Sequence, residues 1–145
     1  MNAKIKKLRD DAIIPIRATM GAAGYDLFAC FDANSVDIAP HETVKIGTGV
    51  AIQPPKNTFG AIFARSGLAA KQGLRPSNCV GVCDEDFTGE YIVALYNDSN
   101  ETRIIHSGQR IAQLVFIPYV SVEFEEVTEL DETDRGICGF GSTGN

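Results

Sequence analysis

Three consecutive acids, Asp84, Glu85 and Asp86, lie between two apolar runs in the stretch VGVCDEDFTGEYIV, residues 80–93. They are three of the 19 acidic residues of the chain. Asp84 directly follows the apolar VGVC, so its side chain can be held firmly at the end of a strand. A carboxylate fixed in this way can act as a general base that takes a proton from water.

Calcium binding is the first alternative for this stretch. Asp84, Asp86 and Thr88 match early ligand positions of an EF-hand loop, but Leu95 stands where the bidentate glutamate is needed, and both flanks are strand-like. We therefore expect a β-hairpin with DEDFTG at its tip, its acids in solvent and Gly89 at positive φ. A purely structural turn and a turn that carries a catalytic Asp84 both remain open.

The stretch ARSGLA, residues 64–69, is a candidate anion site. The sequence predicts one short helix here, with Ser66 as its N-cap, helix formers from Leu68 to Gln72, and Gly73 as its end. The free amides of a helix start attract anions, and Arg65 can add a bidentate contact to phosphate. An ordinary capped helix with a surface arginine is the other interpretation.

Two further stretches carry polar groups suited to a nucleotide. The glycines of RGICGFGSTG, residues 135–144, allow backbone amides to wrap phosphate, and Phe140 can stack on a base. A mobile tail without function is the alternative. In GQRIAQL, Arg110 and Gln113 are three apart on an expected strand, so we expect them on opposite faces of the sheet. Gln113 needs a partner, either in the core or on a ligand.

The elements that position these groups are mostly strands. In TVKIGTGVAIQ, residues 43–53, Val44, Ile46, Thr48, Val50 and Ile52 alternate along one face. Other β-rich segments are TFGAIFA, EYIVALY, RIIH and RIAQLVFIPYVSVEF, separated by QPPKN, DSNE and HSGQ. Short strands with regular turns predict an all-β sandwich or barrel in one domain of 145 residues.

Composition limits the classes of function. The net charge of −6 argues against a general nucleic-acid binder, and there is no apolar run of the length of a membrane span. Without a secretory signal, we expect a cytoplasmic protein with reduced thiols. The four cysteines are expected to be small buried side chains, and His41 and His106 to lie at the surface or in turns.

Taken in order, five stretches resemble the conserved motifs of the trimeric dUTP pyrophosphatases (dUTPases). They are AAGYDLFA (22–29), ARSGLA (64–69), NCVGVCDEDFTGEY (78–91), GQRIAQLVF (108–116) and RGICGFGSTG (135–144). The resemblance implies a distorted jelly-roll or β-barrel fold, a homotrimer with active sites shared between subunits, and closure of the site by a mobile tail, residues 135–145. It also implies Mg²⁺-assisted hydrolysis of dUTP to dUMP and pyrophosphate.

The resemblance assigns roles position by position. It implies that Asp84 is the general base and that Asp26 supports the catalytic water and the metal shell, with Mg²⁺ held by phosphates and waters rather than by a direct protein ligand. The implied substrate contacts are Arg65, Ser66, Gly67, Asn78, Val82, Cys83, Phe87, Ile92, Gln113, Arg135, Phe140, Gly141 and Ser142. Of these, Asn78 and the backbone at Val82 and Cys83 would read uracil, and Phe140 would stack on it.

The chain departs from the family pattern at Phe87, where tyrosine is usual, and at Cys83, where isoleucine is usual. The Phe87 ring is expected to retain selectivity for deoxyribose. Two alternatives stay open: a dCTP deaminase of the same superfamily, alone or bifunctional, and a dUTP-binding regulatory protein. The intact Asp84, Arg65, Ser66 and Arg135 favour an enzyme.

Overall fold

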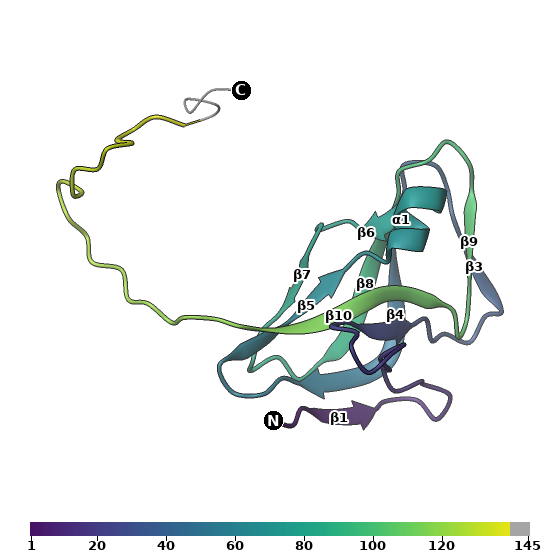
Figure 1. The fold of residues 1–145 in the computed structure, drawn as a ribbon. Helices are drawn as coiled ribbons and strands as arrows, with labels where there is room; N and C mark the ends of the chain where they lie inside the picture. The colour runs from purple at the N-terminus through teal and green to yellow at the C-terminus, as the bar shows by residue number, and fades with distance from the viewer. Residues whose placement is uncertain (140–145) are drawn as a thin grey trace.

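The computed structural model describes residues 1–139, and its fold is all-β of the jelly-roll type with one short helix (Figure 1). Antiparallel strands form two four-stranded sheets and a two-stranded ribbon. The strands are β1 (Lys4–Lys7), β2 (Tyr25–Phe28), β3 (Ser35–Ile38), β4 (Thr43–Gln53), β5 (Thr58–Phe63), β6 (Leu74–Pro76), β7 (Gly81–Cys83), β8 (Glu90–Asn97), β9 (Arg103–His106) and β10 (Arg110–Pro118). The predicted fold class is confirmed.

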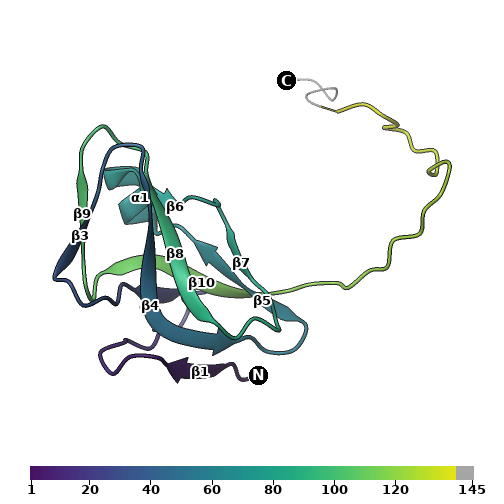
Figure 2. The same cartoon turned by 180° about the vertical axis from the view of Figure 1, so that it is seen from behind.

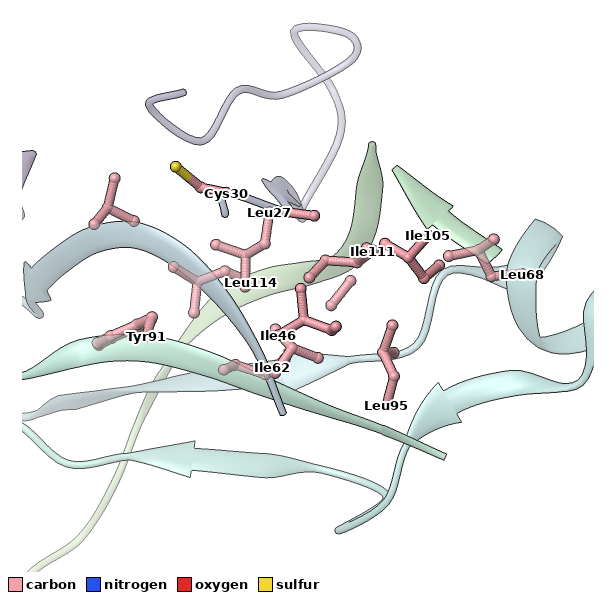
Figure 3. Close-up of a cluster of buried hydrophobic side chains, with 14 of the residues drawn as sticks. Leu27, Cys30, Ile46, Ile62, Leu68, Tyr91, Leu95, Ile105, Ile111 and Leu114 are labelled. Carbon is pink, nitrogen blue, oxygen red and sulfur yellow. The ribbon is translucent and has the colours of Figure 1, made fainter. Parts of the chain in front are cut away.

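The first sheet has the order β1-β4-β8-β6, the second β2-β10-β5-β7, and the ribbon pairs β3 with β9 (Figure 2). In the long strand β4, Ile46, Thr48, Val50 and Ile52 are buried and Val44 is half-buried, as predicted. Gly49 and Ala51 are buried as well, and a register shift between Gly47 and Ala51 interrupts the expected alternation. Figure 3 shows Leu27, Ile62 and Leu114 of the second sheet meeting Ile46, Tyr91 and Leu95 of the first. Burial of these apolar side chains between the sheets is the main force that holds them together.

Helix α1 (Ser66–Gln72) forms where it was predicted, but Ser66 is not its N-cap. Arg65 occupies that position in an extended conformation and makes no side-chain capping bond, so the prediction was wrong by one residue. Gly73 ends the helix as expected, because its φ of 69° is a left-handed conformation that glycine adopts without strain.

The predicted hairpin at DEDFTG is wrong. Strand β7 pairs with β5, whereas β8 pairs with β4 and β6, so residues 84–89 cross from one large sheet to the other. Gly89 does not have positive φ. A Cβ at Gly89 would lie 2.7 Å from Cζ of Phe87, so a larger residue here would displace the Phe87 ring.

The cysteine prediction holds for two residues and fails for two. Cys30 and Cys83 are buried, but Cys79 and Cys138 are exposed. Cys79 lies in the turn between β6 and β7, with a φ of 61°, and its side chain does not face the core. His41 and His106 are both exposed, as expected.

Beyond β10 the chain leaves the body of the fold (Figure 1). The strand ends at Pro118, although the β-rich sequence continues to Phe124, because its partner β5 begins at Thr58, which pairs with Pro118. Every residue from 118 to 139 is exposed. No helix in the described part of the chain has the length and apolar character needed to cross a membrane.

Candidate functional site

A pocket of ≈ 750 Å³ lies where β2, β10 and the start of α1 meet. Because its charged lining includes Arg65 and Arg110, we call it the arginine pocket. The predicted site residues Asp26, Ser66, Gly67 and Gln113 also line it, together with Ala18, Ala22, Ala23, Gly24, Phe63, Ala64, Cys79 and Val115.

Asp26 holds the two arginines of this pocket in place. Its Oδ1 accepts a hydrogen bond from Nε of Arg65 at 2.9 Å, and its Oδ2 accepts one from Nη1 of Arg110 at 3.1 Å. The Asp26 side chain is only 12 % exposed, whereas Arg110 is 49 % exposed. The carboxylate therefore serves as a buried anchor, and the guanidinium groups lie nearer to solvent, where an anion can reach them.

Arg110 and Gln113 line the same pocket, which corrects the expectation that they face opposite sides of the sheet. A β-bulge between Arg110 and Ala112 shifts the register with β2, and Ile111 and Ala112 are both buried in succession. The extra residue reverses the alternation, so Arg110 turns toward the side of Gln113. The Nε2 of Gln113 donates to the carbonyl of Ala64 at 2.9 Å, which ties the strand to the start of α1.

The start of α1 adds backbone donors. The amides of Leu68 and Ala69 both donate to the carbonyl of Arg65, so those of Ser66 and Gly67 are left without a partner inside the helix. A Cβ at Gly67 would meet nothing within 4 Å, which shows that the space beside this backbone is open. The arrangement can receive several oxygens of a phosphate chain.

A second pocket, of ≈ 840 Å³, contains the three acids, and we call it the acidic pocket. It is lined by Gln53, Asn57, Phe59, Val82, Asp84, Glu85, Asp86, Tyr119 and Ser121. Asp84 is exposed at the end of β7. Glu85 is not the solvated turn residue that the sequence suggested, because it accepts hydrogen bonds from the backbone N–H of Asn57 at 2.7 Å and from the hydroxyl of Tyr119 at 3.1 Å.

The two pockets share no lining residue and lie at opposite ends of β5. Phe63 lines the arginine pocket and Phe59 the acidic pocket. Four residues of strand span about 13 Å at ~3.3 Å per residue. A single chain thus places Asp84 apart from Asp26 and the arginines.

The remaining predicted residues lie around β7 and β8. Asn78 is exposed in the turn before β7, Val82 is 61 % exposed, and Ile92 is 48 % exposed. Phe87 is 42 % exposed and stacks on the buried ring of Tyr91, with the centroids 6.1 Å apart. Cys83 is buried, and loss of solvent raises the pKa of its thiol to about 11, so it is a neutral packing group at pH 7.

Of the predicted tail residues, Arg135 is described, and it lines neither pocket. The only tail contact of Arg135 among the described residues is local, with its Nε donating to the carbonyl of Cys138 at 2.9 Å. Phe140, Gly141 and Ser142 lie outside the described residues. Within residues 1–139, no group of three His, Cys, Asp or Glu side chains is arranged to hold a metal ion.

The dUTPase family model matches residues 10–144. The chain belongs to the dUTPase family.

Curated relatives support this assignment over the full length. A deoxyuridine 5'-triphosphate nucleotidohydrolase of Desulfitobacterium hafniense strain DCB-2 is 48 % identical, covering 99 % of this chain and 97 % of the relative. One from Hydrogenobaculum is 46 % identical, covering 99 % of both. Among solved structures, a mutant dUTPase of Staphylococcus bacteriophage 80alpha with dUpNHpp has a TM-score of 0.89 at 28 % identity, covering 99 % of both chains. A mutant dUTPase from phage phi11 of S. aureus, described for its structural Mg(II) ion, has a TM-score of 0.81 at 25 % identity and covers 91 % of this chain and all of that one.

Sequence reasoning missed the placement of two residues that line the pockets, one in each. Arg110 was assigned to the wrong face, since the bulge cannot be seen in a pattern of alternating residues. Glu85 was dismissed because its partners, Asn57 and Tyr119, are 28 and 34 residues away in the chain. No local signal could have identified either contact.

Proposed function

We propose that the chain hydrolyses dUTP to dUMP and pyrophosphate, with a water activated by Asp84 attacking the α-phosphorus. The observation that carries the proposal is that the exposed Asp84 carboxylate occurs in a member of the dUTPase family that covers 97 % of a curated relative. The relative from D. hafniense bears the name of this activity, and the phage 80alpha structure contains the analogue dUpNHpp.

In the proposed reaction, Asp84 accepts a proton from water while the water oxygen forms a bond to the α-phosphorus. The bond from that phosphorus to the bridging oxygen breaks, and pyrophosphate leaves with the bond electrons. Asp84 suits this role because its carboxylate is exposed and has no arginine partner among the described ion pairs. By contrast, both oxygens of Asp26 are occupied by arginine, so Asp26 is the supporting acid.

The arginine pocket binds the phosphates in this proposal. Arg65, the amides of Ser66 and Gly67, and the side chain of Gln113 all line it and suit an oxyanion chain. Electrostatic stabilisation by such preorganised donors is usually the largest contribution to phosphoryl-transfer catalysis. The pocket compensates locally for a chain whose net charge is −6.

The pyrimidine and sugar are read around β7. Asn78 and the main chain of Val82 and Cys83 pair with the uracil edge, and Phe87 with Ile92 borders the deoxyribose. Cytosine would place a donor where uracil has an acceptor, and such unpaired polar groups in a closed site discriminate strongly. The buried Cys83 side chain leaves only its backbone available for this contact.

Mg²⁺ fits the described residues only as a partner of the triphosphate. The oxygens of Asp26 accept from two arginines, and no three-residue cluster of metal-ligating side chains is present in residues 1–139. When bound with the nucleotide, the ion would neutralise phosphate charge and favour departure of pyrophosphate. The residues of this chain then need only orient the phosphates and the water.

Assembly as a homotrimer unites the two pockets in this proposal. Asp84 and the arginines lie at opposite ends of β5 in one chain, so a complete site needs the arginine pocket of one copy and the acidic pocket of another. The tail, residues 135–145, then closes over the nucleotide, with Arg135 on the γ-phosphate and Phe140, Gly141 and Ser142 at the base and phosphates. The exposed segment from Tyr119 onward would allow the tail to extend from the body of the fold to the nucleotide (Figure 1).

The product dUMP supplies dTMP synthesis, and removal of dUTP keeps uracil out of DNA. This cellular role follows from the proposed reaction, and we propose the cytoplasm as its location.

Pyrophosphate release from dUTP, dCTP, dTTP and UTP with Mg²⁺ tests the reaction. We expect a clear preference for dUTP, and a chain that ends at Asp134 should remain folded but turn over dUTP more slowly. Ammonia release from dCTP would identify a deaminase instead. Tight dUTP binding without any release of pyrophosphate would identify a regulatory protein.

A further inference from the structure

Glu85 is the second residue of the turn that carries Asp84. The backbone N–H of Phe87 donates to the carbonyl of Asp84 at 3.2 Å, which closes the turn, and residues 85 and 86 form its corner. The orientation of the Asp84 carboxylate therefore depends on whatever holds this corner in place.

The Glu85 carboxylate is one corner of a closed set of three hydrogen bonds. Its Oε2 accepts from the N–H of Asn57 at 2.7 Å and from the hydroxyl of Tyr119 at 3.1 Å. The N–H of Tyr119 in turn donates to the carbonyl of Asn57 at 3.2 Å. We call Asn57, Glu85 and Tyr119 the Glu85 triangle.

The other two corners of the triangle are stiff. Asn57 has a φ of 60° and ends a turn that contains Pro54 and Pro55, in which both the N–H and the hydroxyl of Thr58 donate to the carbonyl of Pro55. Tyr119 follows Pro118, which pairs with Thr58 as the last residue of β10. Two ordered strand ends thus converge on one carboxylate oxygen.

Tyr119 is also the residue at which the exposed segment leaves the fold (Figure 1). The hydrogen bond to Glu85 raises the pKa of Tyr119, so the phenol stays protonated and remains a donor. The triangle consequently joins the root of the tail to the turn that carries Asp84.

We infer that Glu85 is a positioning residue: it orients the Asp84 turn and couples it to the root of the tail through Asn57 and Tyr119. This role rests on the proposed hydrolysis of dUTP. It differs from the roles assigned to the family motifs, because Glu85 would act through its bonded neighbours Asn57 and Tyr119. Misplacement of a catalytic group by about 1 Å can cost about 10²-fold in rate.

The test compares Glu85→Ala, Glu85→Gln and Tyr119→Phe in the full chain. Glu85→Ala should lower kcat for dUTP by about 10- to 100-fold, with KM and dUpNHpp affinity little changed. Glu85→Gln keeps an acceptor oxygen and should restore most of kcat. Tyr119→Phe should give an intermediate loss, and the double variant Glu85→Ala/Tyr119→Phe should be no slower than Glu85→Ala, because both changes break one network.

Asp37→Ala is the matched control, since it removes an exposed acid on the β3–β9 ribbon. The melting temperatures of all variants should stay close to wild type, because water replaces the exposed bonds of Glu85. A kcat for Glu85→Ala within twofold of wild type, or additive losses in the double variant, would overturn the role of Glu85 but leave the proposed hydrolysis of dUTP intact. A wild-type chain that releases no pyrophosphate from dUTP overturns the proposed function and this role with it.

Discussion

The arginine pocket and the acidic pocket hold their carboxylates in opposite ways. In the first, both oxygens of Asp26 are bonded to guanidinium groups, and the side chain is 12 % exposed. In the second, Asp84 is exposed, and it is its neighbour Glu85 that accepts the hydrogen bonds. A carboxylate whose lone pairs are occupied is a good anchor, and one with open lone pairs can accept a proton from water.

Under the proposed function, the arginine pocket binds the phosphates and the acidic pocket carries the base. Fixed arginines lower the cost of holding a triphosphate, since their geometry is organised before the ligand arrives. An acid whose oxygens are both bonded to arginines, as those of Asp26 are, is a poor base. Separation of the two pockets along β5 keeps Asp84 free in the single chain.

Asp84→Asn should have the largest effect. The amide keeps the shape of the side chain but cannot take a proton from water, so we expect kcat to fall by about 10²- to 10⁴-fold. Affinity for dUpNHpp should stay near wild type, because the proposed phosphate contacts lie in the arginine pocket. Steady-state kinetics together with calorimetric binding would separate the two quantities. Near-normal turnover would remove Asp84 from the role of base.

Arg110→Ala should weaken the arginine pocket and leave the acidic pocket intact. Its loss removes one of the two partners of Asp26, and we expect kcat/KM to fall by about tenfold or more, mainly through KM. The melting temperature should decrease slightly, because a mostly buried carboxylate loses a partner. Arg17→Ala, which removes an arginine outside both pockets, is the matched control.

These two variants also test whether the pockets combine between copies. If each site uses the arginine pocket of one copy and the acidic pocket of another, random co-refolding of equal amounts of Asp84→Asn and Arg110→Ala restores about one quarter of the sites. If both pockets of one chain served the same site, the mixture would show no more than the sum of the separate activities.

Several features of this molecule could be predicted from sequence alone. The apolar positions of β4 predicted buried residues correctly, although not the register shift between Gly47 and Ala51, and Gly73 predicted the end of α1, because these signals are local. The pairing of β7 with β5 rather than β8 could not be predicted, since partner choice depends on contacts far apart in the chain. The roles predicted for Asp84, Arg65 and Gln113 rest on motif order, which carries no information about the pocket in which each one lies.

The bulge at Arg110 and the Glu85 triangle are the clearest examples of features that could not be predicted from the sequence. One inserted residue in β10 reverses the face of a side chain, and no residue type in GQRIAQL marks that insertion. In the sequence Glu85 looks like an ordinary solvated acid, because its partners Asn57 and Tyr119 are far away in the chain. Both features depend on register and tertiary contact, and both alter how a catalytic or binding group is held.

Phe87→Tyr should have the smallest effect, and it would show which part of the side chain at position 87 determines selectivity for deoxyribose. Phe87 stacks on Tyr91 and is 42 % exposed, so an added hydroxyl can point to solvent without disturbing the stack. We expect kcat/KM for dUTP, and its ratio to that for UTP, to change by less than about threefold, whereas Phe87→Ala should relax sugar selectivity by about tenfold or more because the ring is lost. Parallel kinetics with dUTP and UTP would check both. A large gain in selectivity for Phe87→Tyr would show that the hydroxyl, rather than the ring stacked on Tyr91, excludes the ribose.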